Sequence, residues 1–178
     1  MTPSTVIEFW IAAGRQRWFG RDPDFDADVQ ERFEATHHAA ARGELDYWGA
    51  SADGALALLL LLDQFPRNMF RGSAHAYATD PMARLVADQA IVRGFDRVVP
   101  EAMRPFFYLP FEHSENSNDQ ARAIELCESM GDPDYVKWAL LHADIIARFG
   151  RFPHRNACLG RVTTPAEAAF LESGGFAG

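Results

Sequence analysis

The most constraining feature of the sequence is an unbroken apolar run of eight residues, Ala55 to Leu62. A helix that is apolar all round has no face that can meet water favourably, so it must be covered by protein on every side. The run is too short to cross a bilayer, which requires about 20 residues. It therefore predicts one buried helix at the centre of the fold and no membrane span.

The apolar run ends abruptly near a proline. Pro66 stops a regular helix because it lacks an N–H and its ring clashes with the preceding turn. Polar side chains gather around it: Asp63, Gln64, Arg67, Asn68 and Arg71. Two interpretations stay open. These residues build a binding site at the end of the helix, or they serve the carbonyl groups that every helix leaves free at its C-terminus.

Helix signals recur along the chain, whereas strand signals do not. A proline follows a capping residue at Asp80, Asp132 and Thr164, and Ser117 with Gln120 fits a capping box. No stretch alternates apolar and polar residues with period two over a useful length. The sequence therefore predicts an all-α fold of about eight helices. We expect a single domain over residues 1–178, a length sufficient for a sizeable core.

Charge and cysteine content limit the classes of function. The net charge is −8, and non-specific nucleic-acid binding requires a basic footprint, so we expect no nucleic-acid partner. Cys127 and Cys158 form no CxxC motif and are expected to be reduced core residues. The N-terminal region shows no signal-peptide pattern. These features together predict a cytoplasmic protein with no membrane partner.

Three blocks of the sequence share a composition. Gln64-Phe-Pro-Arg-Asn68 is echoed by Arg151-Phe-Pro-His-Arg-Asn156, and each follows a strongly apolar helix. The blocks are residues 62–68 (LDQFPRN), 108–115 (YLPFEHSE) and 148–156 (RFGRFPHRN). They resemble the signature of a bacterial family of unknown function placed among tetratricopeptide-repeat-like helical folds. The resemblance implies a right-handed array of helix pairs, here around the buried helix, and it implies no activity, cofactor or catalytic residue.

The blocks are rich in arginine although the protein is acidic. The planar fork of arginine binds carboxylate or phosphate through two bonds. One interpretation is therefore a binding module with a pocket for a small anionic ligand, or for a carboxylate of a protein or peptide partner. Its residues would be Asp63, Gln64, Arg67, Asn68, Arg71, Arg148, Arg151, His154, Arg155 and Asn156. The alternative is that Asp63, Glu112, Glu115 and Asp144 neutralise the arginines inside the fold.

His113 supports a second function. It follows Glu112 and precedes Glu115 by two positions, a setting that suits a general acid or base. This favours, as the alternative to a binding module, a hydrolase or lyase acting on a small anionic metabolite. We expect neither a metal nor a cofactor, because no metal-ligand spacing or glycine-rich phosphate loop occurs. No catalytic constellation is complete in the sequence, so whether the protein is an enzyme stays open.

Three other histidines have structural interpretations. His142 shares an apolar helix face with Trp138 and Ile146, which predicts a hydrogen-bonded core histidine. His37 and His38 are adjacent, so on a helix their side chains point about 100° apart and cannot easily share a metal. We expect both of these residues at the surface or at its boundary.

Overall fold

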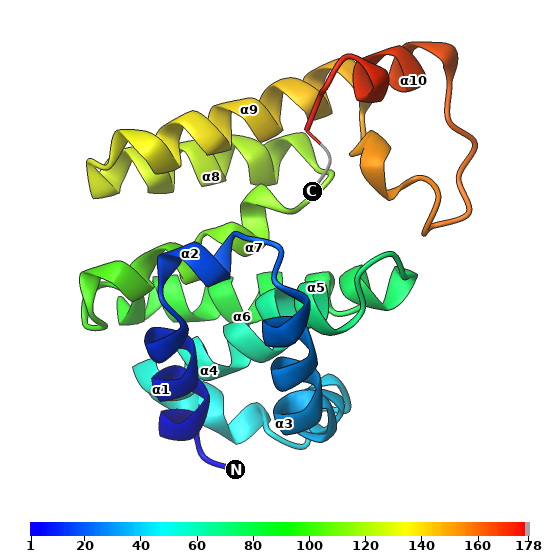
Figure 1. The fold of residues 1–178 in the computed structure, drawn as a ribbon. Helices are drawn as coiled ribbons and strands as arrows, with labels where there is room; N and C mark the ends of the chain where they lie inside the picture. The colour runs from blue at the N-terminus through cyan, green and yellow to red at the C-terminus, as the bar shows by residue number, and fades with distance from the viewer. Residues whose placement is uncertain (177–178) are drawn as a thin grey trace. The chain divides into compact units, whose positions relative to one another are not determined.

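A computed structural model describes residues 1–176, and the regular structure of this part of the chain is entirely helical (Figure 1). The α-helices are α1 (Pro3–Ala13), α2 (Arg15–Trp18), α3 (Pro23–Ala41), α4 (Ala52–Leu59), α5 (Phe65–Met69), α6 (Asp80–Val92), α7 (Leu109–Glu112), α8 (Ser117–Met130), α9 (Pro133–Phe149) and α10 (Pro165–Glu172). Short 3₁₀ segments and one π segment, Leu60–Gln64, lie between them. The predicted all-α class is confirmed, while the tetratricopeptide-like order of helix pairs stays a prediction. No helix of the described residues is long and apolar enough to span a membrane.

The chain divides into two compact units. The first contains Met1–Arg71 and His75–Pro110, and the second contains Gly72–Ala74 and Phe111–Gly178. Each unit buries apolar side chains of its own. The single domain expected over residues 1–178 stays a prediction beside this division.

The first unit is built around the apolar run. Every residue from Ala55 to Leu62 is at most 2% exposed, which confirms the predicted buried helix. Helix α4 contacts α1 and α6, and its π extension contacts α3. Gly54 allows the short 3₁₀ segment before α4 to pass close by, because a Cβ there would lie 1.9 Å from the carbonyl oxygen of Trp48. Aromatic rings fill the space between these helices: Trp10, Phe25, Phe33, Phe65 and Phe106.

The second unit is organised by the hairpin of α8 and α9, which lie side by side (Figure 1). Gly131, at φ +75°, ends α8 in the left-handed conformation that glycine adopts without a Cβ penalty. The Asp132 side chain then accepts from the N–H of Asp134 and caps α9. The predicted capping box at Ser117 was wrong by one residue, because the Asn116 side chain caps α8 instead. Both cysteines are free thiols.

Shortening a side chain of the buried apolar run should lower the free energy of unfolding far more than shortening an exposed side chain of a surface helix. Leu61 is fully buried, so Leu61→Ala is expected to lower the free energy of unfolding by about 2–5 kcal/mol through lost burial and a cavity. Leu85 on α6 is 60% exposed, and Leu85→Ala should change stability by no more than about 0.5 kcal/mol. Urea unfolding of the two variants measures both effects. Equal losses would contradict a core centred on α4.

Candidate functional site

The polar residues after the buried helix begin with a change of helical register. Over Leu60–Gln64 the chain forms a π turn, in which the N–H of Phe65 bonds to a carbonyl five residues back. Pro66 then interrupts the hydrogen bonding, because it has no N–H to offer. The carbonyl of Leu62 loses its α-helical donor, and the carbonyl of Leu61 loses its π-helical donor. Two buried carbonyl groups therefore need donors from elsewhere in the fold.

Side chains from two other parts of the fold form hydrogen bonds with these carbonyl groups. Nδ1 of His37, on α3, lies 2.8 Å from the carbonyl oxygen of Leu61. The hydroxyl of Thr79, just before α6, donates to the carbonyl of Leu62 at 2.6 Å. The expectation that His37 lies at the surface or at its boundary was wrong: the residue is 4% exposed, and its ring contacts the carbonyl of the buried Leu61. His38 is exposed, as expected.

Burial lowers the pKa of His37 below its ordinary value of 6.5, with the bond to Leu61 opposing this effect. The unfolded state therefore binds more protons than the folded state as the pH falls through 6.5, and stability falls with it. His37→Phe keeps a ring of similar size and removes the titration. We expect the loss of unfolding free energy between pH 7.5 and 5.5 to be smaller in this variant. An unchanged pH dependence would show that His37 does not titrate with folding.

The first block places the guanidinium group of Arg67 beside the π turn. The guanidinium of Arg67 donates to both carboxylate oxygens of Asp80 at 2.9 and 3.0 Å, and lies 3.2 Å from the carboxylate of Asp63. It also donates to the Asp63 carbonyl at 2.6 Å. Burial by itself would lower the pKa of Arg67, but the two carboxylates outweigh it and raise that pKa. Asp63, which is fully buried, also accepts from the Gln64 amide at 2.5 Å.

The rest of this block binds a single carboxylate of α3. The amide of Asn68 donates to Asp26 at 2.7 Å, and the guanidinium of Arg71 donates to the same group at 2.5 and 3.1 Å. Asp26 was not predicted as a partner, and the prediction that Asp80 caps α6 was wrong, because the N-cap residue is Thr79 and Asp80 is the first residue of the helix. Both lie in the first turn of their helices, where acidic residues are common. The sequence indicates that both acids lie near helix starts, but it does not indicate which arginine each of them binds.

The Arg67–Asp80 pair should be strongly coupled, because neither side chain is exposed by more than 20%. Arg67→Met leaves two buried carboxylates without their cation, and we expect it to lower the free energy of unfolding by about 3–5 kcal/mol. Asp80→Asn should cost less when Arg67 is already replaced. A double-mutant cycle by urea unfolding measures this coupling, and strictly additive losses would contradict the pairing.

The second and third blocks meet in the second unit through Glu115. Its carboxylate accepts from the backbone N–H of Phe152 at 2.8 Å and from the guanidinium of Arg161 at 2.7 and 3.0 Å. Burial would raise the pKa of Glu115, but the Arg161 fork and the N–H of Phe152 outweigh it, so that pKa is lowered. Arg155 donates to the carbonyl of His113 at 3.0 Å, and its guanidinium lies over the ring of Phe152. Arg161 was missed because it lies outside the three blocks.

Glu167 is the other carboxylate of this network. Arg151 donates to its two oxygens at 2.6 and 2.9 Å, Asn156 lies 3.3 Å away, and the N–H of Thr164 donates at 2.7 Å. The bonds from Arg151 and then Thr164 lower the pKa of Glu167. The remaining arginine of the block, Arg148, pairs with Asp144 at 3.3 Å on the exposed face of α9.

Glu112 is one of the two carboxylates that the enzyme alternative offered to orient His113. One of its carboxylate oxygens lies 3.0 Å from Nδ1 of His142. The same nitrogen lies 2.8 Å from the carbonyl of Trp138, and His142 is 5% exposed. The predicted hydrogen-bonded core histidine is therefore confirmed. The ring of His113 lies 6.5 Å from that of His142.

Cys127 lies near the same carboxylate. Burial and then the charge of Glu112 raise the pKa of its thiol to about 12, so at neutral pH it is not a nucleophilic thiolate. Within residues 1–176, no group of three or more His, Cys, Asp or Glu side chains is arranged to hold a metal ion.

The site residues named from the sequence thus fall into two networks. Asp63, Gln64, Arg67, Asn68 and Arg71 meet Asp26 and Asp80 in the first unit, whereas in the second unit Arg151 and Asn156 meet Glu167, and the N–H of Phe152 meets Glu115. The other predicted residues of the third block have separate contacts: Arg148 with Asp144, Arg155 with the carbonyl of His113, and His154 with the ring of Phe152. Each of these carboxylates accepts from an arginine inside its own unit. This is the internal neutralisation offered as the alternative, in which Glu115 was a predicted partner and Asp26, Asp80 and Glu167 were not. The pocket for an anionic ligand stays a prediction.

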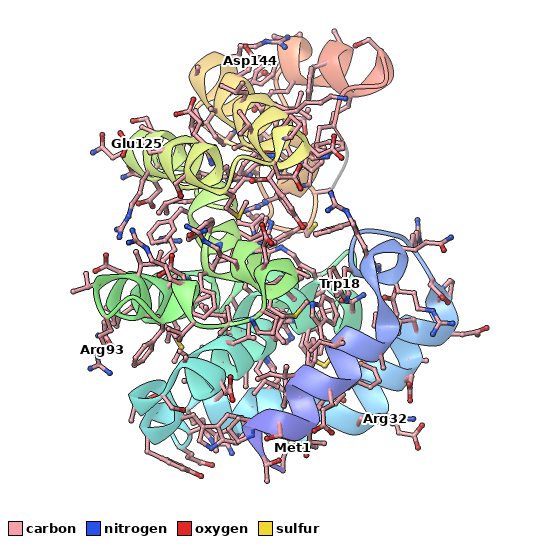
Figure 2. All side chains as sticks on the ribbon, turned by 90° about the vertical axis from the view of Figure 1, so that its left-hand side faces the viewer. Met1, Trp18, Arg32, Arg93, Glu125 and Asp144 are labelled. Carbon is pink, nitrogen blue, oxygen red and sulfur yellow. The ribbon has the colours of Figure 1, made fainter. Side chains whose placement is uncertain are left out.

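Two hollows of the described surface are lined by residues outside these networks. One, of about 520 Å³, lies at the tip of the α8–α9 hairpin and is lined by Glu128, Gly131, Pro133, Val136, Lys137 and Leu140. We call it the hairpin groove. Another, of about 440 Å³, lies between α1 and α3, where Figure 2 labels Met1 and Arg32.

Comparison with known proteins agrees with this helical architecture. The profile of the bacterial family of unknown function DUF924 matches residues 6–175. The chain belongs to the DUF924 family. The family resemblance seen in the three sequence blocks is therefore confirmed. A solved structure of a protein of unknown function from Agrobacterium tumefaciens is 53% identical to this DUF924 chain, with a TM-score of 0.92, over 96% of this chain and 97% of that one. No curated protein matches this DUF924 chain significantly.

Proposed function

We propose that this protein is a binding module whose protein partner inserts a basic, apolar segment into the hairpin groove. The observation that carries the proposal is the outer face of α9. Leu140 is 51% exposed beside a hollow that Pro133 and Val136 also line. These three positions recur at helical spacing along one side of α9, next to its contact with α8, where Val136 packs against the cluster of Cys127, Tyr135 and Ala139. An apolar helix face beside a hollow is typical of a surface that binds a partner.

The charge around the groove selects the partner. Residues 125–137 carry four carboxylates, those of Glu125, Glu128, Asp132 and Asp134, and one ammonium group, that of Lys137, for a net charge of −3. Glu125 projects outward from α8 in Figure 2. A second copy of the chain would bring the same negative charge to this face, and so would an acidic peptide. A segment with lysine or arginine around an apolar stripe is complementary in both charge and apolar surface.

This proposal keeps the protein-binding interpretation and changes the chemistry of the partner. The anionic partner rested on arginines. In the described residues Arg67, Arg71, Arg148 and Arg151 donate to carboxylates of their own unit, and Arg155 donates to the carbonyl of His113. The hydrolase or lyase alternative takes His113 as the acid or base, oriented by Glu112 or Glu115. Glu112 lies 3.0 Å from His142, and Glu115 accepts from Phe152 and Arg161, so both carboxylates have structural partners in the second unit.

Two amphipathic helical peptides with the same leucines, one with lysines and one with glutamates, test the groove. We expect the lysine peptide to bind, measured by fluorescence anisotropy, and the glutamate peptide not to bind. Leu140→Asn should raise the dissociation constant of the lysine peptide at least about tenfold, which corresponds to about 1.4 kcal/mol of binding free energy. The matched control is Leu85→Asn, because Leu85 is exposed on α6 in the first unit. Equal binding of the two peptides, or equal losses in the two variants, would overturn the proposal.

A further inference from the structure

A cluster of rings on the second unit surrounds the side chain of Phe176. The phenyl ring lies 4.6 Å from the imidazole of His142, 5.2 Å from that of His154 and 6.4 Å from the indole of Trp138, between ring centroids. The ring planes cross at 57–81°, which is the edge-to-face range that aromatic pairs favour. We call Trp138, His142 and His154 the aromatic box. It is built by α9 and the turn after it, and Phe176 comes from beyond α10.

The backbone before Phe176 forms a tight turn that places this ring in the aromatic box. Gly174 has φ +81°, in the region that favours glycine. A Cβ at Gly175 would lie 2.5 Å from the carbonyl oxygen of Phe170 and 2.6 Å from its ring. The N–H of Gly175 donates to that same carbonyl at 3.0 Å. Two adjacent glycines are therefore needed for the chain to turn tightly around the end of α10 and return to the box.

The ring is also the main attachment of this segment. Ser173, Gly174 and Gly175 bond to carbonyl groups in the last turns of α10, within five residues along the chain. Contact with more distant residues, in the described part of the segment, comes from Phe176, which packs on the box and beside Phe152. Phe176 is itself only partly buried, and Trp138 at the rim is 46% exposed. A segment held by one partly buried ring can leave its site at modest cost.

We propose that the aromatic box is a binding site for an aromatic side chain of a peptide segment, and that Phe176 is its resident occupant. A partner that presents a phenylalanine after small residues replaces Phe176 and meets the same three rings. The tethered Phe176 competes at an effective concentration in the millimolar range, which sets the threshold that a partner must exceed. The proposal does not depend on the hairpin groove. Trp138 and His142 are each two positions from Leu140, so they lie about 160–200° around α9 from it.

The test uses a synthetic peptide with the sequence of residues 171–178, LESGGFAG, and a second peptide with alanine in place of its phenylalanine. Phe176→Ala empties the box in the full chain. We expect the phenylalanine peptide to shift the imidazole NMR signals of His142 and His154 saturably in this variant. The wild type should require at least tenfold more peptide, and the alanine peptide should have no effect. Phe19→Ala, at an exposed phenylalanine of the first unit, should behave as the wild type.

A second variant opens the box without removing the phenyl ring of Phe176, in case Phe176→Ala destabilises the fold. Gly175→Ala retains Phe176 but forces the segment away from Phe170, so it should also open the box. Binding of the phenylalanine peptide to either folded variant, and weaker binding to the wild type, supports the proposal. Equal binding to all chains, or no binding to the folded variants, overturns it. Unfolding of both variants also overturns it, because Phe176 would then be a fixed core residue.

Discussion

The N–H that Pro66 lacks is the constraint on which the first unit depends. The buried helix cannot continue its hydrogen bonding past this residue, and the two carbonyls that lose their donors lie where water cannot reach them. Each such carbonyl would cost about 1–3 kcal/mol if it stayed unpaired. His37 from α3 and Thr79 from the start of α6 supply the missing donors. One covalent feature thus fixes where two other helices meet the central one.

The same need for partners governs the charges. Asp26, Asp80 and Glu167 lie in the first turns of α3, α6 and α10, where a carboxylate is favoured by the positive end of the helix dipole. Each one also binds an arginine from the end of another helix or from the turn that follows it. A carboxylate that does both joins the start of one helix to the end of another. The arginines of the blocks therefore have a structural role within each unit, because they link the end of one helix to the start of another.

This division explains how much of the molecule the sequence could predict. The all-helical class, the buried helix, and the caps at Asp132 and Thr164 follow from short-range patterns, because periodicity and capping act within one turn. The core role of His142 followed from the apolar face around it. The partners in the networks could not be predicted. Asp26 lies 45 residues from Arg71, and Glu115 lies 46 residues from Arg161, so only the folded topology brings each pair together.

The pairing of these charges changes where function is expected in a helical protein of this kind. An arginine that already donates twice to a carboxylate must give up those bonds to bind another anion, whereas an exposed apolar side chain gives up only its contact with water. In the second unit such surface concentrates on α9, which uses one side for the core with α8. Leu140 lines the hairpin groove, and Trp138 forms part of the aromatic box. A helix whose own unit covers only part of its apolar surface is suited to bind a further segment, and Phe176 already shows the form that one such segment takes.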